Sequence, residues 1–117
     1  MSVRGFHFTG SVRVCNSNTN GGRTLIEGCR LDAGFTTTCA NGIGETVHLR
    51  SCLVTGDVYV DAYGADFTGN TVLRGEARVH SNGLGAVIRD NVVIGPSARG
   101  LSSTSGDSPG LLTGNFV

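Results

Sequence analysis

A four-residue pattern recurs six times along this chain and constrains the fold more than any other feature of the sequence. Each copy holds an apolar residue, a polar residue, a small or turn-forming residue, and then a small polar residue or a thiol. The copies are Phe8–Ser11, Ile26–Cys29, Leu49–Cys52, Phe67–Asn70, Ile88–Asn91 and Leu112–Asn115. Their last positions, 11, 29, 52, 70, 91 and 115, are 18, 23, 18, 21 and 24 residues apart. A period of about 20 residues is typical of proteins built from stacked repeats.

The residues that follow each copy indicate that the repeats are coils of a solenoid. An apolar residue stands two positions after the last column in five copies, and the first copy has Arg13 there instead. The apolar residues are Leu31, Val54, Val72, Val93 and Val117. Two short strands that meet at a corner would each point an apolar side chain inward in this way. We therefore expect one all-β domain over residues 1–117, a single-stranded parallel β-helix of about six short coils stacked about 4.8 Å apart.

The composition agrees with such a fold and argues against several functions. Nineteen glycines, two prolines and no tryptophan in 117 residues are typical of short strands separated by turns. The nine basic residues balance nine acidic residues, so we expect no nucleic acid as a partner. No apolar run is long enough to span a membrane, and the residues after Met1 lack the apolar stretch of a signal peptide. All nine basic residues are arginine, which suggests the coding bias of a GC-rich bacterium or one of its viruses.

The last column of the pattern carries a family resemblance. Asn70, Asn91 and Asn115 each follow a glycine or an aspartate. This column resembles the asparagine ladder of pectate-lyase-like right-handed parallel β-helices. The resemblance covers nearly the whole chain and implies a right-handed coil whose buried amides hydrogen bond along the stack, but it implies little about function. The full predicted column is Ser11, Cys29, Cys52, Asn70, Asn91 and Asn115. Only its C-terminal half is a continuous asparagine ladder.

Charged residues are expected on one outward-facing sheet. If the apolar residue of each copy points inward, the residues on either side of it point outward. This places His48 beside Asp66, and Glu27 beside Arg50, in neighbouring coils. His48, Asp66, Arg50 and Arg89 are therefore candidates for acid–base chemistry on an acidic sugar. Opposite charges on adjacent strands are also ordinary cross-strand pairs. We favour that interpretation and expect no catalytic residue and no enzymatic activity.

We expect neither a metal nor a cofactor. The spacings of the four cysteines contain no C-x-x-C pair. Asp57, Asp61 and Asp66 form only a loose acidic group, and the first two are expected to be solvated.

Two of the cysteines fall in one column. Cys29 and Cys52 would lie in adjacent coils with their Cα atoms about 5 Å apart, within the range that a disulfide can span. We favour two buried, reduced thiols, because a reduced cysteine packs as a small apolar residue. Cys15 and Cys39 have no comparable geometric argument.

The pattern runs from the start of the sequence to its end, so neither end of the predicted solenoid is expected to be capped. Contact with protein would cover such ends, either on a larger particle or on another copy of the chain. The polar segment at about 97–110 is expected to be a flexible or contact loop, and residues 80–82 a polar turn at the rim.

The sequence thus predicts a non-enzymatic structural component of a multisubunit particle. A bacteriophage virion protein, either a capsid decoration or a tail-associated protein, fits the small size, the arginine-only basic set and the uncapped ends. Its partners would be proteins of the shell or tail, or copies of itself, with neither nucleic acid nor membrane involved. The alternative is a polysaccharide lyase-like or hydrolase-like enzyme, or a carbohydrate-binding β-helix module. The virion is the expected location, and the alternatives are secretion, or the bacterial cytoplasm before assembly.

Overall fold

The protein is a solenoid of short parallel strands. The computed structural model describes residues 1–14, 22–37, 46–95, 101–105 and 111–116. No helix in these ranges has the length and apolar character that crossing a membrane requires. Every strand pairing in them is parallel. The strands are β1 (Ser2–Arg4), β2 (His7–Phe8), β3 (Val12–Val14), β4 (Arg23–Glu27), β5 (Arg30–Leu31), β6 (Phe35–Thr37), β7 (Thr46–Arg50), β8 (Leu53–Thr55), β9 (Val58–Thr68), β10 (Thr71–Leu73), β11 (Ala77–Arg89), β12 (Val92–Ile94), β13 (Leu101–Ser105) and β14 (Leu111–Thr113).

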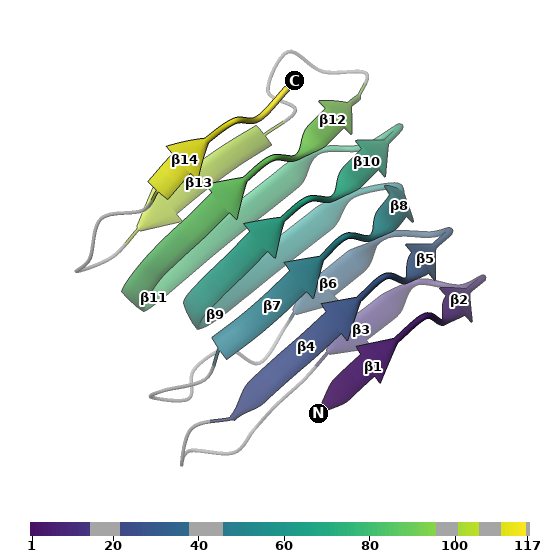
Figure 1. Ribbon diagram of the computed structural model, residues 1–117, viewed down its shortest axis with the longest axis horizontal. Helices are drawn as coiled ribbons and strands as arrows, with labels where there is room; N and C mark the ends of the chain where they lie inside the picture. The colour runs from purple at the N-terminus through teal and green to yellow at the C-terminus, as the bar shows by residue number, and fades with distance from the viewer. Residues whose placement is uncertain (15–21, 38–45, 96–100, 106–110, 117) are drawn as a thin grey trace.

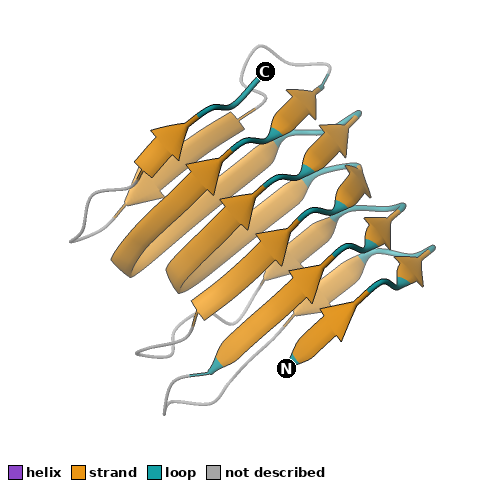
Figure 2. Cartoon of the chain, in the orientation of Figure 1, coloured by secondary structure: helices purple, strands orange, loops and turns teal. Residues whose placement is uncertain are grey.

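The coils are right-handed and have three faces (Figures 1 and 2). The first face stacks β1, β4, β7, the second halves of β9 and β11, and β14. The second face stacks β2, β5, β8, β10 and β12. The third face stacks β3, β6, the first halves of β9 and β11, and β13. β9 and β11 are long because each continues through the corner between the third and first faces.

This architecture confirms the predicted fold class, an all-β parallel β-helix. The chain makes about four turns rather than six. Among the described residues the last coil is incomplete, since it contains only β14 and a single bridge between Val92 and Phe116.

The segment at 97–110 is not wholly a loop. Residues Leu101–Ser105 form β13, which pairs with Ala77–Ser81 of β11. The rest of that segment lies outside the described residues. Residues 80–82 are also part of β11 and not a rim turn, and the side chain of Ser81 is fully buried.

The prediction is wrong for the first coil. Ser2–Arg4 pairs with Leu25–Glu27, and β2 pairs with β5, so Phe6 and not Ser11 shares the column of Cys29. Ser11 lies exposed before β3. The physical reason is the backbone of the corner, where a residue with positive φ directly precedes the column at every rung. Those residues are Gly5, Gly28, Ser51, Gly69, Asp90 and Gly114, whereas Gly10 has no positive φ.

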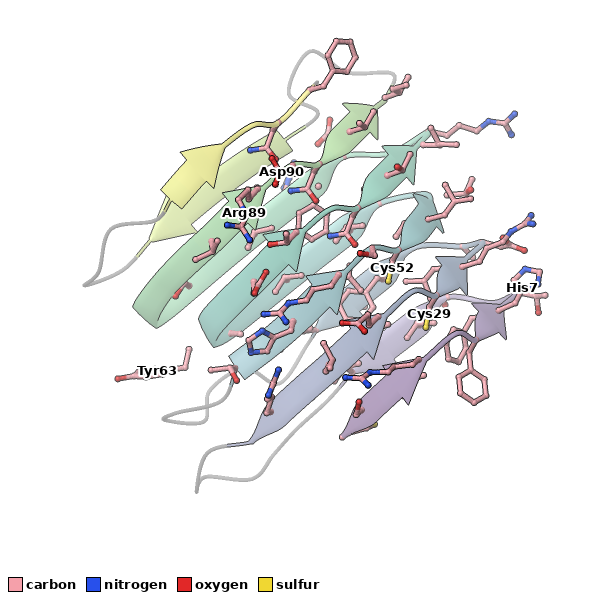
Figure 3. The ribbon with its side chains drawn as sticks, viewed as in Figure 1. His7, Cys29, Cys52, Tyr63, Arg89 and Asp90 are labelled. Carbon is pink, nitrogen blue, oxygen red and sulfur yellow. The ribbon has the colours of Figure 1, made fainter. Side chains whose placement is uncertain are left out.

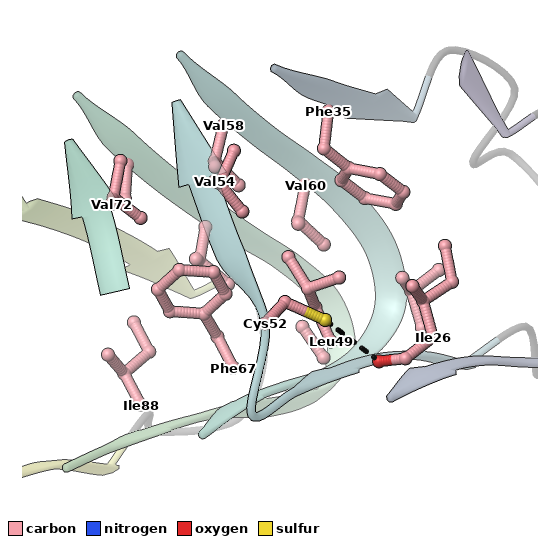
Figure 4. Packing of buried hydrophobic residues seen from close by; sticks show 14 of the residues in the cluster. Ile26, Phe35, Leu49, Cys52, Val54, Val58, Val60, Phe67, Val72 and Ile88 are labelled. Atoms are coloured by element: carbon pink, nitrogen blue, oxygen red, sulfur yellow. Dashed lines mark hydrogen bonds between the residues drawn. The ribbon is translucent and has the colours of Figure 1, made fainter. Parts of the chain in front are cut away.

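The core lies between the three faces and is filled by stacked apolar columns (Figure 4). Ile26, Leu49, Phe67 and Ile88 form the column of the first face and are at most 2% exposed. Leu31, Val54, Val72 and Val93 form the column of the second face, also at most 1% exposed. The apolar residues that the repeat pattern predicts to point inward therefore do so in the middle coils.

Candidate functional site

The predicted asparagine ladder runs along the corner between the first and second faces, in the C-terminal half of the solenoid. Asn70 donates from Nδ2 to the carbonyl of Leu49 at 2.8 Å, and Asn91 donates likewise to Phe67 at 2.8 Å. The Oδ1 of Asn91 accepts from the backbone N–H of Asn70 at 2.9 Å, and the Oδ1 of Asn115 accepts from that of Asn91 at 3.0 Å. Each amide thus satisfies one carbonyl in the coil before it and one N–H in the same column.

Two thiols continue this ladder toward the N-terminus. Cys52 lies with Sγ 3.6 Å from the carbonyl of Ile26, and Cys29 lies with Sγ 3.8 Å from that of Val3. These carbonyls occupy the same register position as the carbonyl of Leu49 that Asn70 binds. The thiols therefore take the place of the amide donor. Figure 3 shows the two sulfurs in neighbouring coils, and neither is in a disulfide, as the sequence favoured. Cys15 and Cys39 lie outside the described residues.

Three of the four candidate catalytic residues meet on the outer surface of the first face. The register places His48 directly beside Asp66, as predicted, and Asp66 lies diagonally across from Arg50. Arg50 donates to Asp66 from Nε at 3.1 Å and also from Nη2. Nη2 of Arg50 lies 3.3 Å from Nδ1 of His48, and Thr68 donates to the other oxygen of Asp66. The carboxylate and the guanidinium are therefore bound to each other and to their neighbours.

The electrostatics of this cluster favour a charged pair beside a neutral imidazole. Partial burial raises the pKa of Asp66, but the hydrogen bonds from Arg50 and Thr68 outweigh it and leave the pKa below its usual range. Partial burial lowers the pKa of His48, and Asp66 offsets this only in part. A neutral His48 whose Nδ1 accepts from Arg50 fits both the geometry and the direction of the shift.

The remaining charged residues form separate pairs. Arg89 lies beside Thr68 in the register, but its Nε is 3.5 Å from the neighbouring Asp90 (Figure 3). Glu27 lies beside Arg50 as predicted and pairs with Arg4 on its other side at 3.5 Å.

A second charged group on the second face has no signal in the sequence pattern. His7 binds Asp32 at 2.7 Å, and Arg30 donates to the other oxygen of Asp32 at 2.8 Å. These two bonds hold the pKa of Asp32 below its usual range. His7 lies 25 residues before Asp32 in the sequence, and only the true register of the first coil, with His7 beside Arg30, brings it to the other two residues.

Two open hollows lie away from the His48 cluster. One, of about 280 Å³, is lined by Asp57, Val58, Tyr59, Glu76 and Arg78 on the third face. The other, of about 340 Å³, is lined by Arg30, Asp32, Thr55, Leu73 and Arg74 on the second face. Within the described ranges, no group of three or more His, Cys, Asp or Glu side chains could hold a metal ion. Asp57, in the loose acidic group, accepts a hydrogen bond from the backbone of Glu76.

Two buried hydroxyl groups, those of Thr37 and Ser81, were not predicted from the sequence. Thr37 is 3% exposed and exchanges hydrogen bonds with the backbone of Asp61 at 3.0 and 2.7 Å. Ser81 donates to the carbonyl of Tyr63 at 2.8 Å and accepts from the N–H of Gly85 at 2.9 Å. Both satisfy backbone groups where the chain rounds the corner between the third and first faces. Most serine and threonine residues in proteins are exposed, so the residue type alone could not reveal this buried role.

The first coil leaves inward-facing apolar side chains only partly covered. Val3, Phe8 and Val12 point inward but are only partly buried. The residues stacked on them in the next coil, Ile26, Leu31 and Phe35, are 2%, 0% and 2% exposed. Phe6, which shares the column of Cys29, is 58% exposed and packs against Phe8 with ring centroids 6.1 Å apart.

Comparison of the chain with protein-family models, with curated proteins and with solved structures finds no match in any of the three. The strand arrangement alone defines the class of the protein as a parallel β-solenoid.

Proposed function

We propose that this protein is a non-enzymatic structural subunit that associates with a second copy of itself through the open edge of its first coil. The observation that carries this proposal is the difference in burial between the first two coils. The same three inward columns are fully covered at Ile26, Leu31 and Phe35 and only partly covered one coil earlier.

The energetics favour covering that edge. In the described ranges, β1, β2 and β3 each have a paired strand on one side only. Such an edge offers unpaired backbone groups to another strand. Fully burying a valine or phenylalanine side chain stabilises by about 1.5–3 kcal/mol, so finishing the burial of several such residues is a substantial drive for association.

The charged surface supports a structural role more than a catalytic one. Asp66 and Arg50 are bound to each other, and neither of the hollows described above contains them. Cross-strand pairs of this kind also hold neighbouring coils in register. A general base needs a free lone pair directed at a substrate, and the Nδ1 of His48 is occupied by Arg50.

The assignment to a bacteriophage virion is part of the same proposal. A bacteriophage virion subunit, as a capsid decoration or tail-associated protein, is a setting in which many copies of a small solenoid meet other proteins. The asparagine ladder supports a place among pectate-lyase-like β-helices, although a fold shared by many proteins does not fix function. Capsid or tail genes beside the gene for this chain would support the virion assignment, and a neighbourhood of sugar-metabolism genes would contradict it.

Sedimentation velocity across a wide range of protein concentration tests the proposed association. We expect the wild type to self-associate and Phe6→Arg, which puts a charge on the open edge, to remain monomeric. Ile94→Arg is the matched control, because Ile94 is 55% exposed on the second face at the far end of the solenoid. A wild type that is monomeric at every concentration, or a loss of association in both variants alike, would contradict the proposal.

The second candidate, a polysaccharide lyase-like or hydrolase-like activity, is favoured by one observation, the convergence of His48, Arg50 and Asp66 on one face. Incubation with polyuronates, followed by absorbance of unsaturated products, tests the lyase form. Turnover that His48→Ala abolishes, with folding intact, would replace the structural proposal.

A further inference from the structure

The two ladder thiols are equivalent by translation along the solenoid. The register of Arg30 with Leu53 places Cys29 directly beside Cys52. Each Sγ contacts the carbonyl two residues earlier in its own coil, at 3.4 Å for Cys29 and 3.2 Å for Cys52. Each also contacts the matching carbonyl of the preceding coil, at 3.8 and 3.6 Å. Because the two side chains make the same contacts, their sulfurs are separated by about one coil rise, near 4.8 Å.

This spacing suits a bridging ion better than a disulfide. A disulfide needs sulfurs about 2.05 Å apart and Cβ atoms about 3.5–4.5 Å apart, so both residues would have to leave the ladder. Two metal–thiolate bonds of about 2.3 Å in line span about 4.6 Å, close to the spacing that the stack imposes. We propose that Cys29 and Cys52 form a two-coordinate site for one soft d10 cation, held in line between their sulfurs.

The number and charge of the ligands define which cation fits. Structural zinc takes four protein ligands, and the described residues offer no third His, Cys, Asp or Glu at this position. Soft cations that accept two thiolates in line, namely Hg(II), Ag(I) and Cu(I), remain. Two thiolates neutralise a divalent ion, whereas a monovalent ion leaves one negative charge in the core, which is costly. Hg(II) should therefore bind most tightly.

Binding exchanges protons for metal and involves no oxidation. Each thiol releases one proton to solvent, and two sulfur–metal bonds replace the two S–H bonds. Because each thiol must lose its proton to bind the cation, the affinity should increase with pH. The path of the cation from solvent to the thiols is short, because only the partly covered first coil lies beyond Cys29, with Phe6 next in the column.

The test uses the full chain with Cys15 and Cys39 replaced by serine, so that only the ladder thiols remain. Mercuric chloride is added, and native mass spectrometry counts the bound ions while ultraviolet absorption follows the thiolate-to-metal charge-transfer band. We expect one ion per chain, a higher thermal midpoint, and no comparable binding of zinc chloride. Cys29→Ser and Cys52→Ser should each weaken binding at least tenfold, and silver nitrate should bind more weakly than mercury.

Several results would overturn the site. One is two ions per chain with one retained in each single variant, since the thiols would then act independently. Another is a chain 2 Da lighter after mild oxidation, since the sulfurs would then be close enough to bond. A third is no bound ion at all. Cys52→Asn replaces the thiol with the amide donor used elsewhere in the ladder, so it serves as the folded variant if the serine variants unfold. Mercury binding by this variant equal to that of its parent would also reject the proposal.

Discussion

Replacing Asn91 by alanine removes the rung of the ladder that lies between two other asparagines. Its side chain is 1% exposed and connects Phe67 in the preceding coil to Asn70 and Asn115. In Asn91→Ala the carbonyl of Phe67 loses its donor and the backbone N–H of Asn70 loses its acceptor. Both groups stay buried, so water cannot replace the amide freely.

The magnitude follows from these two orphaned groups. A buried backbone group left without a partner costs about 1–3 kcal/mol, so the pair costs about 2–6 kcal/mol. The small cavity left by the amide adds to this. We expect a loss of about 3 kcal/mol or more in the free energy of unfolding. With a urea slope of about 2 kcal/mol/M, the midpoint should fall by about 1.5 M.

Urea unfolding followed by far-ultraviolet circular dichroism measures this loss. Asn115→Ala should cost less, because Asn115 is only half-buried and water can reach its partners. Thr9→Ala changes an exposed turn residue and should stay within about 0.5 kcal/mol of the wild type. If Asn91→Ala unfolds at the same urea concentration as Thr9→Ala, the ladder does not stabilise the coils.

Four further predictions concern single positions. Gly75→Ala should destabilise by about 2 kcal/mol or more in urea unfolding, because its Cβ would lie 2.2 Å from the carbonyl oxygen of Gly56. Asp90→Gly should stabilise by up to about 1 kcal/mol, because Asp90 has a φ of 57° that glycine adopts without strain. Burial lowers the pKa of His48, so the wild type should lose stability as the pH falls below 6.5, and His48→Gln should abolish that slope between about pH 7.5 and 5. Burial raises the pKa of Cys52 to about 11, so the wild type should lose stability as the pH rises from 9 toward 11. Cys52→Asn should remove that loss and unfold at the same or a higher urea concentration at neutral pH; a lower midpoint would contradict the equivalence of thiol and amide in the ladder.

The repeat predicted the middle of the solenoid because a corner imposes several requirements at once. At Asn70 and Asn91 the column residue, the inward residue before it and the valine after it all agree with the observed register. In the first coil the segment ending at Ser11 matches only part of the pattern, and Arg13 stands where an apolar residue should. The segment ending at Phe6 meets the other requirements, with Gly5 before the column and Phe8 two residues after it, but it has a phenylalanine where the pattern expects a small polar residue or a thiol.

For the surface cluster of His48, Arg50 and Asp66, only the contacts that follow from strand register could be predicted. Stacking places His48 beside Asp66, and the period alone is sufficient to find that pair. That Arg50 reaches diagonally to Asp66 and also contacts His48 depends on side-chain rotamers, which no period encodes. The buried hydroxyls of Thr37 and Ser81 lie at a corner without a repeated sequence signature, so the backbone groups they satisfy become visible only in three dimensions.

Nuclear magnetic resonance of the isotope-labelled chain tests the central claim, that like residues stack directly on one another from coil to coil. Asn91 donates from its side chain to Phe67, 24 residues earlier, and accepts from the backbone of Asn70, 21 residues earlier. We predict a through-hydrogen-bond coupling between the Nδ2 of Asn91 and the carbonyl carbon of Phe67, and slow exchange of the Asn70 amide proton. A missing coupling together with rapid exchange of that proton would contradict it.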